Sequence, residues 1–305
     1  RRALDAIVVN YRVLQPLVNP EFAEEAQPIH PDGNLIRRIR LRHGPQEVVG
    51  DVVVEGTYEV GMQDQAPLGT ESGLAIPDDQ GGIDLYVSTQ WLHADRDQVA
   101  ACLGLEPEAV RLTLAGVGGA FGAREDISLH VHLCLLAFHT GRPVKMSYSR
   151  TESFHGHVHR HPASMWYRHH ARADGTLVRV EARLLFDGGA YASTSSAVVA
   201  NATCFSVGPY RVESAQIEGV AVRTNNPPCG AMRGFGCVQA CFAHEAQMDR
   251  LADALGMDPV QLRLVNALEP GDRIITGQRI TGTAPVAEVI SSCADHPSAA
   301  TLSDD

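Results

Sequence analysis

The sequence lacks the close cysteine pairs that build zinc ribbons and iron–sulfur clusters. Its seven cysteines include no Cys-x-x-Cys pair, and the nearest two, Cys237 and Cys241, are four residues apart. Such clusters are usually ligated by close pairs of this kind. The odd, scattered set also differs from the dense, even framework of a small secreted domain. We therefore expect a reducing, cytoplasmic compartment and no redox cluster held by this chain itself.

Long apolar runs and an excess of basic residues are also missing. No apolar segment approaches the roughly 20 residues of a membrane-spanning helix. Lysine and arginine total 25 against 36 aspartates and glutamates, which gives a formal charge of -11. Generic nucleic-acid binding needs clustered cations to neutralise phosphates. The sequence therefore predicts neither a membrane nor a nucleic acid as a partner.

Enough apolar residues are present, 44% of 305, to bury a substantial core. Strand-like runs and helical spacings are both present, and no internal repeat is found. The expected strands are 5–14, 52–60, 85–89, 110–114, 143–149, 165–173, 177–187 and 217–224. The expected helices are 95–103, 125–140, 237–255 and a short one after Asp258-Pro259.

A glycine-rich segment, Gly118-Gly119-Ala120-Phe121-Gly122, connects an expected strand to the expected helix 125–140. It is no Walker loop, because Gly-Lys-Ser/Thr is absent, and it lacks the GxGxxG order of a dinucleotide fold. It is either a tight turn, which glycine permits, or a loop whose amides face an anionic, oxygen-rich ligand at a helix N-terminus. The spacing alone leaves both interpretations open.

Two further segments carry chemistry if they line a common pocket. Glu125 stands at the start of the expected helix, where the helix dipole stabilises a carboxylate, and in a pocket it would hydrogen-bond ring nitrogens of a substrate. Arg233 and Phe235, within Arg-Gly-Phe-Gly, combine a planar cation with a flat ring. The alternatives are a helix-terminal charge for Glu125, and a turn with a salt bridge and a core phenylalanine for the second segment.

Four histidines alternate at positions 155, 157, 159 and 161. On a strand they would share one face, and a zinc or copper site is conceivable. No neighbouring acid or cysteine completes a ligand set, so we do not predict a metal site there.

In order and at similar intervals, these segments resemble the molybdenum hydroxylases of the xanthine dehydrogenase and aldehyde oxidase family. The matching motifs are Ser88-Thr89-Gln90, Gly118 to Glu125, Thr140 to Val144, Arg160-His161-Pro162, Thr224 to Pro227 and Arg233 to Gly236. The resemblance implies an α+β fold of mixed sheets with packed helices, with the first molybdopterin-binding domain over residues 51–285 and the end of the preceding hammerhead domain over residues 1–14. Composition predicts the rest: a linker over residues 15–50, where prolines interrupt a polar stretch, and a disordered tail over residues 286–305, which ends in small, polar and acidic residues.

The resemblance implies a molybdenum cofactor, as Mo-molybdopterin or its cytosine dinucleotide form. The expected reaction hydroxylates a purine such as hypoxanthine or xanthine at an electron-poor carbon, using water. Electrons would pass to 2Fe-2S and FAD groups on partner domains or subunits. The alternatives are oxidation of an aldehyde or another N-heterocycle by the same centre, or a non-catalytic assembly module.

The resemblance also implies roles for individual residues. Gln90, Phe121 and Arg233 would surround the molybdenum, and Gly119, Ala120 and Gly122 would complete the cofactor-binding loop. Glu125 would bind the purine ring and Phe235 would stack on it. The Arg-His-Pro motif would belong to the scaffold.

Three departures from the family pattern limit these expectations. Ala120 replaces a loop glycine, and Asn201 falls at or near the position of a second substrate-binding arginine. The family's catalytic glutamate belongs to the second half of the molybdopterin region, so no catalytic base is assigned here. The chain alone is expected to be inactive and to need the remaining half of that subunit.

Overall fold

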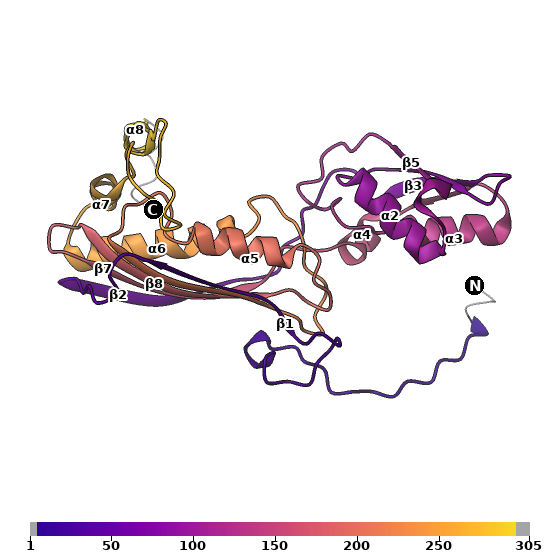
Figure 1. Cartoon of the computed structure of the whole chain (residues 1–305), viewed down its shortest axis with the longest axis horizontal. Helices are drawn as coiled ribbons and strands as arrows, with labels where there is room; N and C mark the ends of the chain where they lie inside the picture. The colour runs from indigo at the N-terminus through magenta and orange to yellow at the C-terminus, as the bar shows by residue number, and fades with distance from the viewer. Residues whose placement is uncertain (1–4, 297–305) are drawn as a thin grey trace.

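The computed structural model describes residues 5–296 and has two lobes side by side (Figure 1). The larger lobe is a five-stranded sheet in the order β1-β9-β8-β7-β2. Its strands are β1 (Leu35–His43), β2 (Val52–Val60), β7 (Ala163–Ala171), β8 (Leu177–Asp187) and β9 (Ser214–Val222). One face of this sheet packs against α5 (Ser195–Cys204) and α6 (Cys237–Leu255).

The smaller lobe is a four-stranded sheet in the order β5-β4-β3-β6. It consists of β3 (Ser72–Pro77), β4 (Ile83–Val87), β5 (Val110–Leu114) and β6 (Val144–Ser147), with helices α2 (Leu92–Leu103) and α3 (His130–Thr140). Each sheet has one parallel pair, β8 with β9 and β4 with β5, among antiparallel ones. The predicted α+β class with mixed sheets is therefore confirmed.

The smaller lobe is an insertion between two neighbouring strands of the larger one. The chain leaves the large sheet at Val60 and returns at Ala163, and these two residues are antiparallel partners. The outgoing and returning segments stay together for a few residues, since Gln63 and Arg160 form a bridge. Both connections therefore cross between the lobes at one end of the large sheet.

Helix ends follow the expected capping chemistry. Gly104, Gly141 and Gly256 end α2, α3 and α6 in the left-handed conformation, which glycine adopts at little cost. Asp258 accepts a hydrogen bond from the amide of Gln261 and begins α7 (Pro259–Asn266). The remaining short helices are η1 (Pro20–Phe22), η2 (Pro107–Ala109), α4 (Arg150–Gly156) and α8 (Val286–Ala294).

The strand expected over residues 5–14 does not form. Residues 7–14 run as extended chain without a strand partner in the described part of the molecule, and Val13 is 90% exposed. A β-branched run becomes a strand only where a neighbouring edge accepts its hydrogen bonds.

The expected linker over residues 15–50 contains the edge strand β1. Ile36, Ile39 and Leu41 pack on the core of the larger lobe, while the arginines between them face outward. The alternation was hidden by the surrounding prolines and charges, and by a register shift between Leu35 and Arg37.

The disordered tail expected over residues 286–305 begins instead with helix α8. Val286, Val289 and Ile290 have the spacing of one helix face, and they line a pocket together with Pro209 and Tyr210. Residues 297–305 lie outside the described residues. Among the described helices, none combines the length and apolar character needed to cross a bilayer.

Candidate functional site

Two loops meet in backbone contact where the lobes join. The glycine-rich loop 118–122 follows β5 of the smaller lobe, and the turn 232–236 precedes α6 of the larger lobe. The amide of Arg233 donates a hydrogen bond of 2.9 Å to the carbonyl of Phe121. Gly122 has a φ of +107°, and a Cβ there would lie 2.4 Å from the carbonyl oxygen of Ala231. Only a glycine fits this contact.

Gln90, in the turn after β4, is held against Arg124, two residues beyond the same loop. Its amide donates to the carbonyl of Arg124 at 2.8 Å, and its Oε1 accepts from the amide of Arg124 at 3.4 Å. The structure therefore brings Gln90, Phe121 and Arg233 to one junction, although they are far apart in the sequence. Their roles toward a cofactor stay predictions.

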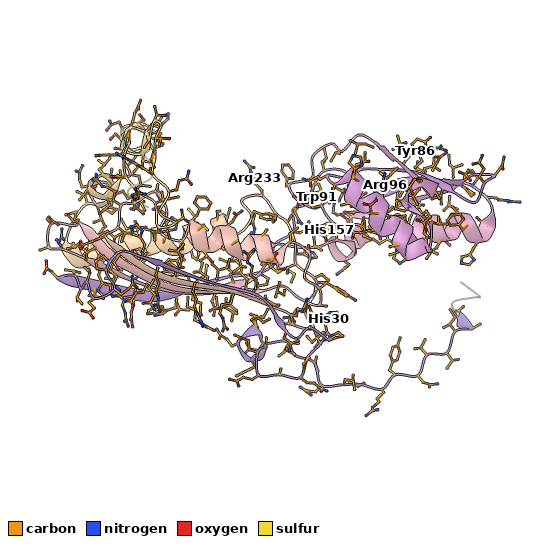
Figure 2. All side chains as sticks on the ribbon, in the orientation of Figure 1. His30, Tyr86, Trp91, Arg96, His157 and Arg233 are labelled. Carbon is orange, nitrogen blue, oxygen red and sulfur yellow. The ribbon has the colours of Figure 1, made fainter. Side chains whose placement is uncertain are left out.

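The donors at this junction suit an anionic, oxygen-rich group. Gly118, Gly119, Phe121 and Gly122 all have positive φ, and backbone of this kind turns successive amides toward one side. Arg233 is exposed and forms no ion pair with any residue from 5 to 296. Figure 2 places Arg233 and Trp91 at the junction of the lobes. Ala120, where the family has glycine, is not among the residues with positive φ, so its side chain is accommodated.

Glu125 does not stand at a helix start, and the expected helix boundary is wrong. Helix α3 begins at His130 rather than at residue 125, because residues 121–129 form turns in which His130 Nδ1 accepts from the amide of Ser128. The glycine-rich loop is therefore not at a helix N-terminus either. Burial and the neighbouring Asp126 raise the pKa of Glu125, against a hydrogen bond from Trp91.

Phe235 belongs to the turn 232–236 of the larger lobe, and Asn201 lies in α5 of the same lobe. Phe235 has a φ of +48° and is partly buried against the core of that lobe. Helix α5 packs on the turn, since a Cβ on Gly236 would meet the carbonyl of Val198 at 2.2 Å. Stacking of Phe235 on a substrate stays a prediction.

Sequence reasoning missed a buried ion pair that supports the junction. The Arg124 and Glu71 side chains are 4% and 1% exposed and bonded to each other, and Arg124 also donates to the carbonyl of Gly69. Burial opposes ionisation of Glu71. Hydrogen bonds, chiefly from His157, and the charge of Arg124 outweigh it and lower the pKa of Glu71 to about 2. Glu71 is therefore a carboxylate across the physiological range.

The Arg-His-Pro motif positions the turn that carries Arg233. The buried Arg160 guanidinium donates to the carbonyl of Arg233 at 2.8 Å and to Gln239 Oε1 at 3.3 Å. His161 Nε2 lies 2.7 Å from Ser195 Oγ, within the larger lobe. Both residues thus hold backbone and helices in place.

The alternate spacing of the four histidines suggested that they share one face of a strand. In the structure they do not. His155 is exposed on α4, His157 and His159 are buried between the lobes, and His161 bonds Ser195. The expectation that no acid completes a ligand set is wrong in three dimensions. Asp64, distant in sequence, lies 2.9 Å from His157 Nε2.

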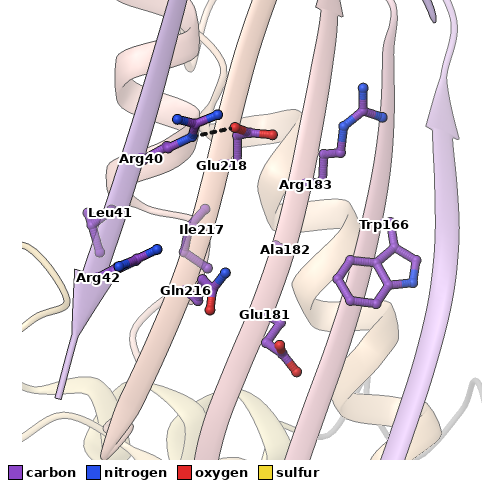
Figure 3. A pocket seen from close by; sticks show the side chains of 10 residues that line it. All are labelled: Arg40, Leu41, Arg42, Trp166, Glu181, Ala182, Arg183, Gln216, Ile217 and Glu218. Carbon is purple, nitrogen blue, oxygen red and sulfur yellow. Dashed lines mark hydrogen bonds and ion pairs between the residues drawn. The ribbon is translucent and has the colours of Figure 1, made fainter. Parts of the chain in front are cut away.

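A pocket of about 240 Å³ lies elsewhere, on the face of the large sheet opposite the helices (Figure 3). One ion pair lies within it, between Arg40 Nε and Glu218 Oε1 at 2.8 Å, whereas Arg183 and Glu181 pair with residues outside the lining. None of the predicted site residues lines it.

Asp95 sits fully buried beneath the Gln90 turn. Thr89 Oγ1 donates to its carboxylate and accepts the amide of Trp91. Burial raises the pKa of Asp95 to about 6, Asp126 adds to the rise, and the Thr89 hydrogen bond opposes it. Between about pH 4 and pH 6, Asp95 therefore keeps a proton in the folded protein that it has lost in the unfolded chain. Stability falls as pH rises from about 4 to about 6, and the loss is complete above that window.

We expect Asp95→Asn to remove this penalty. The free energy of unfolding at pH 7.5 should rise by on the order of 2 kcal/mol relative to the unsubstituted protein, and the two should converge near pH 4. Urea unfolding at both pH values measures this. Asp97→Asn, an exposed position on the same helix, is the control and should change little at either pH.

Comparisons with known proteins identify the family of this chain. The sequence profile of the molybdopterin cofactor-binding domain matches residues 47–267. The nicotinate dehydrogenase large molybdopterin subunit of Eubacterium barkeri is 39% identical over 295 residues, covering 95% of this chain and 69% of that subunit. A probable xanthine dehydrogenase subunit of Bacillus subtilis is 36% identical, covering 97% of this chain and 40% of that protein.

Solved structures show the same fold. Aldehyde oxidoreductase from Desulfovibrio gigas superposes with a TM-score of 0.87 at 30% identity, over 94% of this chain and 32% of that one. Quinoline 2-oxidoreductase from Pseudomonas putida 86 gives 0.86 at 26% identity, over 99% of this chain and 40% of the other. The chain thus spans only part of these relatives. It belongs to the molybdopterin cofactor-binding domain family, within the xanthine dehydrogenase and aldehyde oxidase family of molybdenum-dependent oxidoreductases.

Proposed function

We propose that this chain forms part of the cofactor and substrate site of a molybdenum hydroxylase that acts on a purine such as hypoxanthine or xanthine. The observation that carries the proposal is the junction itself. Gln90 is bonded to Arg124, two residues beyond the glycine-rich loop, and Phe121 of that loop is bonded to Arg233 of the other lobe. Because the chain spans part of its relatives, the activity is proposed for the complete assembly.

The residues at the junction would bind and orient a molybdopterin cofactor, which when bound supplies two-electron oxidation. The Gln90 carboxamide, the amides around Phe121 and the guanidinium of Arg233 are the donors for its anionic oxygens. Arg160 fixes the carbonyl of Arg233 and so positions that turn. No residue here is assigned as the base, which the remaining half of the molybdopterin subunit would provide.

Glu125 and Phe235 are proposed to bind the substrate. The Glu125 carboxyl is partly desolvated and lies beside Trp91, so it can hydrogen-bond the ring nitrogens of a heterocycle. A flat ring such as Phe235 stacks on heteroaromatic faces. Electrons would leave through 2Fe-2S and FAD groups on partner chains, in the cytoplasm.

A second candidate is another N-heterocycle of the nicotinate type. It is favoured by the 39% identity to a nicotinate dehydrogenase subunit and by Asn201, which offers no second cation for a purine. Both candidates are electron-poor heterocycles and use the same junction.

Replacement of Glu125 by valine in the complete enzyme tests the purine proposal. We expect kcat/KM for hypoxanthine to fall about 10–100-fold, because a hydrogen bond to a charged group contributes roughly 1.5–3 kcal/mol, while the rate on an aldehyde is kept. Steady-state kinetics on hypoxanthine, nicotinate and an aldehyde provide the measurement.

Glu108→Val, at an exposed glutamate of the same lobe, is the matched control, and molybdenum content should stay near one per chain in all variants. An unchanged purine rate in Glu125→Val would remove the reason for naming a purine. Absence of molybdenum from the unsubstituted enzyme would favour the assembly-module alternative.

A further inference from the structure

A second cluster of ligand-type side chains lies between the lobes, apart from the junction donors. Asp64 Oδ2 is 2.9 Å from His157 Nε2 and 3.3 Å from His159 Nε2. Ligand atoms from the three residues all lie within 4.8 Å of one another. Tetrahedral zinc ligands at bond lengths near 2.1 Å are separated by about 3.3 Å, so the two distances from Asp64 suit one small cation.

The cluster joins the two connections between the lobes. Asp64 belongs to the segment that leaves β2, and His157 and His159 belong to the segment that returns toward β7. These segments meet at the bridge between Gln63 and Arg160. A cation here would tie the outgoing and returning chains together.

The Nδ1 atom of His157 faces a carboxylate oxygen. It lies 2.9 Å from Glu71 Oε1, and the same oxygen accepts from the guanidinium of Arg124, so the geometry makes Nδ1 the donor and leaves Nε2 as the acceptor nitrogen. A carboxylate that orients a histidine in this way is the usual outer partner of a metal-binding imidazole. Arg124 in turn secures the charge of Glu71.

This arrangement leaves an unsatisfied lone pair in the interior. The His157 side chain is 1% exposed, and its Nε2 makes no hydrogen bond although Asp64 Oδ2, also without one, faces it. Two acceptors that face each other in a buried place repel unless a proton or a cation lies between them. With Nδ1 serving Glu71, a cation satisfies Nε2, Asp64 and His159 at once.

We propose that Asp64, His157 and His159 bind one Zn²⁺ that clamps the two connections between the lobes. Two imidazoles and a carboxylate are a donor set that zinc accepts. His159 Nε2 also lies 2.9 Å from the carbonyl of Phe154, and it must give up this contact to bind the ion. Asp64 and His159, 17% and 11% exposed, give the ion a path from solvent.

Zinc binding by the purified protein, with the subunits that accompany it, tests the proposal. After chelator treatment, the protein is titrated with Zn²⁺ against a chromophoric chelator. The unsubstituted protein should bind one equivalent more than Asp64→Asn or His159→Gln, or bind that equivalent at least 10-fold more tightly. Added Zn²⁺ should raise the melting temperature of the unsubstituted protein and of neither variant.

His155→Gln is the matched control, because it removes an exposed histidine of the same run and should bind zinc as the unsubstituted protein does. Equal zinc binding by all four proteins, or none by any, would overturn the proposal and indicate that His157 is a protonated ion-pair partner of both acids. Circular dichroism confirms folding, and His159→Gln decides if Asp64→Asn fails to fold. Molybdenum content is measured in parallel, so failure of the zinc site is distinguishable from failure of the proposed enzyme.

Discussion

Gly122→Ala is expected to separate the two loops of the junction. A methyl group at this position would lie 2.4 Å from the oxygen and 2.6 Å from the carbon of the Ala231 carbonyl, and both are backbone atoms that cannot rotate away. The φ of +107° is also disfavoured for alanine. Together these effects should cost about 3 kcal/mol or more of stability and weaken the bond between Arg233 and Phe121.

Gly118→Ala in the same loop is the control. It introduces the backbone strain of a positive φ without a steric clash. Gly118 has a φ of +66°, but nothing lies within 4 Å of a Cβ built on it, so the cost should be about 1 kcal/mol. Urea unfolding and molybdenum content would be measured on both variants. Equal losses of stability and metal in the two would show that the contact with Ala231 does not hold the junction together.

Arg124→Ala is the second substitution with a large expected effect. It leaves Glu71 charged and buried without its cation, and breaking a buried pair in this way typically costs about 3–5 kcal/mol. Denaturant unfolding at neutral pH measures the loss. Arg172→Ala, which breaks an exposed pair with Glu213, is the matched control and should cost less than about 1 kcal/mol.

The pH dependence of the free energy of unfolding tests the same substitution independently. The pKa of Glu71 lies at about 2 in the folded protein, below its ordinary 4.5. Its stabilisation is therefore present above about pH 4.5 and is lost as the pH falls toward 2. Without Arg124 the pKa rises, so the acid-induced loss of stability should begin at a higher pH. If Arg124→Ala began to lose stability at the same acidic pH as the unsubstituted protein, the role of Arg124 would be contradicted.

The sequence predicted well where local patterns decide the structure. Strand β2, strand β5 and helix α6 have the expected bounds because their side-chain periods continue to the ends. The predictions were wrong where a neighbouring strand determines whether a segment becomes a strand. Residues 7–14 look like a strand but have no described edge to join, whereas β1 has such an edge in β9. Tertiary context overrides local propensity in both places.

Only those residues of the candidate site that belong to recognisable motifs could be predicted from the sequence. The motifs containing Gln90, Phe121 and Arg233 pointed to residues that the fold does bring together. The side chains that support them, Glu71 and Arg160, belong to contacts between segments far apart in the chain. No spacing within the sequence could reveal that Asp64 faces His157, because the smaller lobe lies between them.

The position of the smaller lobe also affects the order in which parts of the protein can fold during synthesis. Strand β2 leaves the ribosome about a hundred residues before β7, its neighbour in the sheet. At roughly 5–20 residues per second, the unpaired edge waits on the order of 5–20 s for its partner. The intervening lobe has its own core around Leu85, Leu129 and Leu133 and so can fold within that interval. Once folded, it presents the two chain ends close together, which shortens the effective loop that β2 and β7 must close.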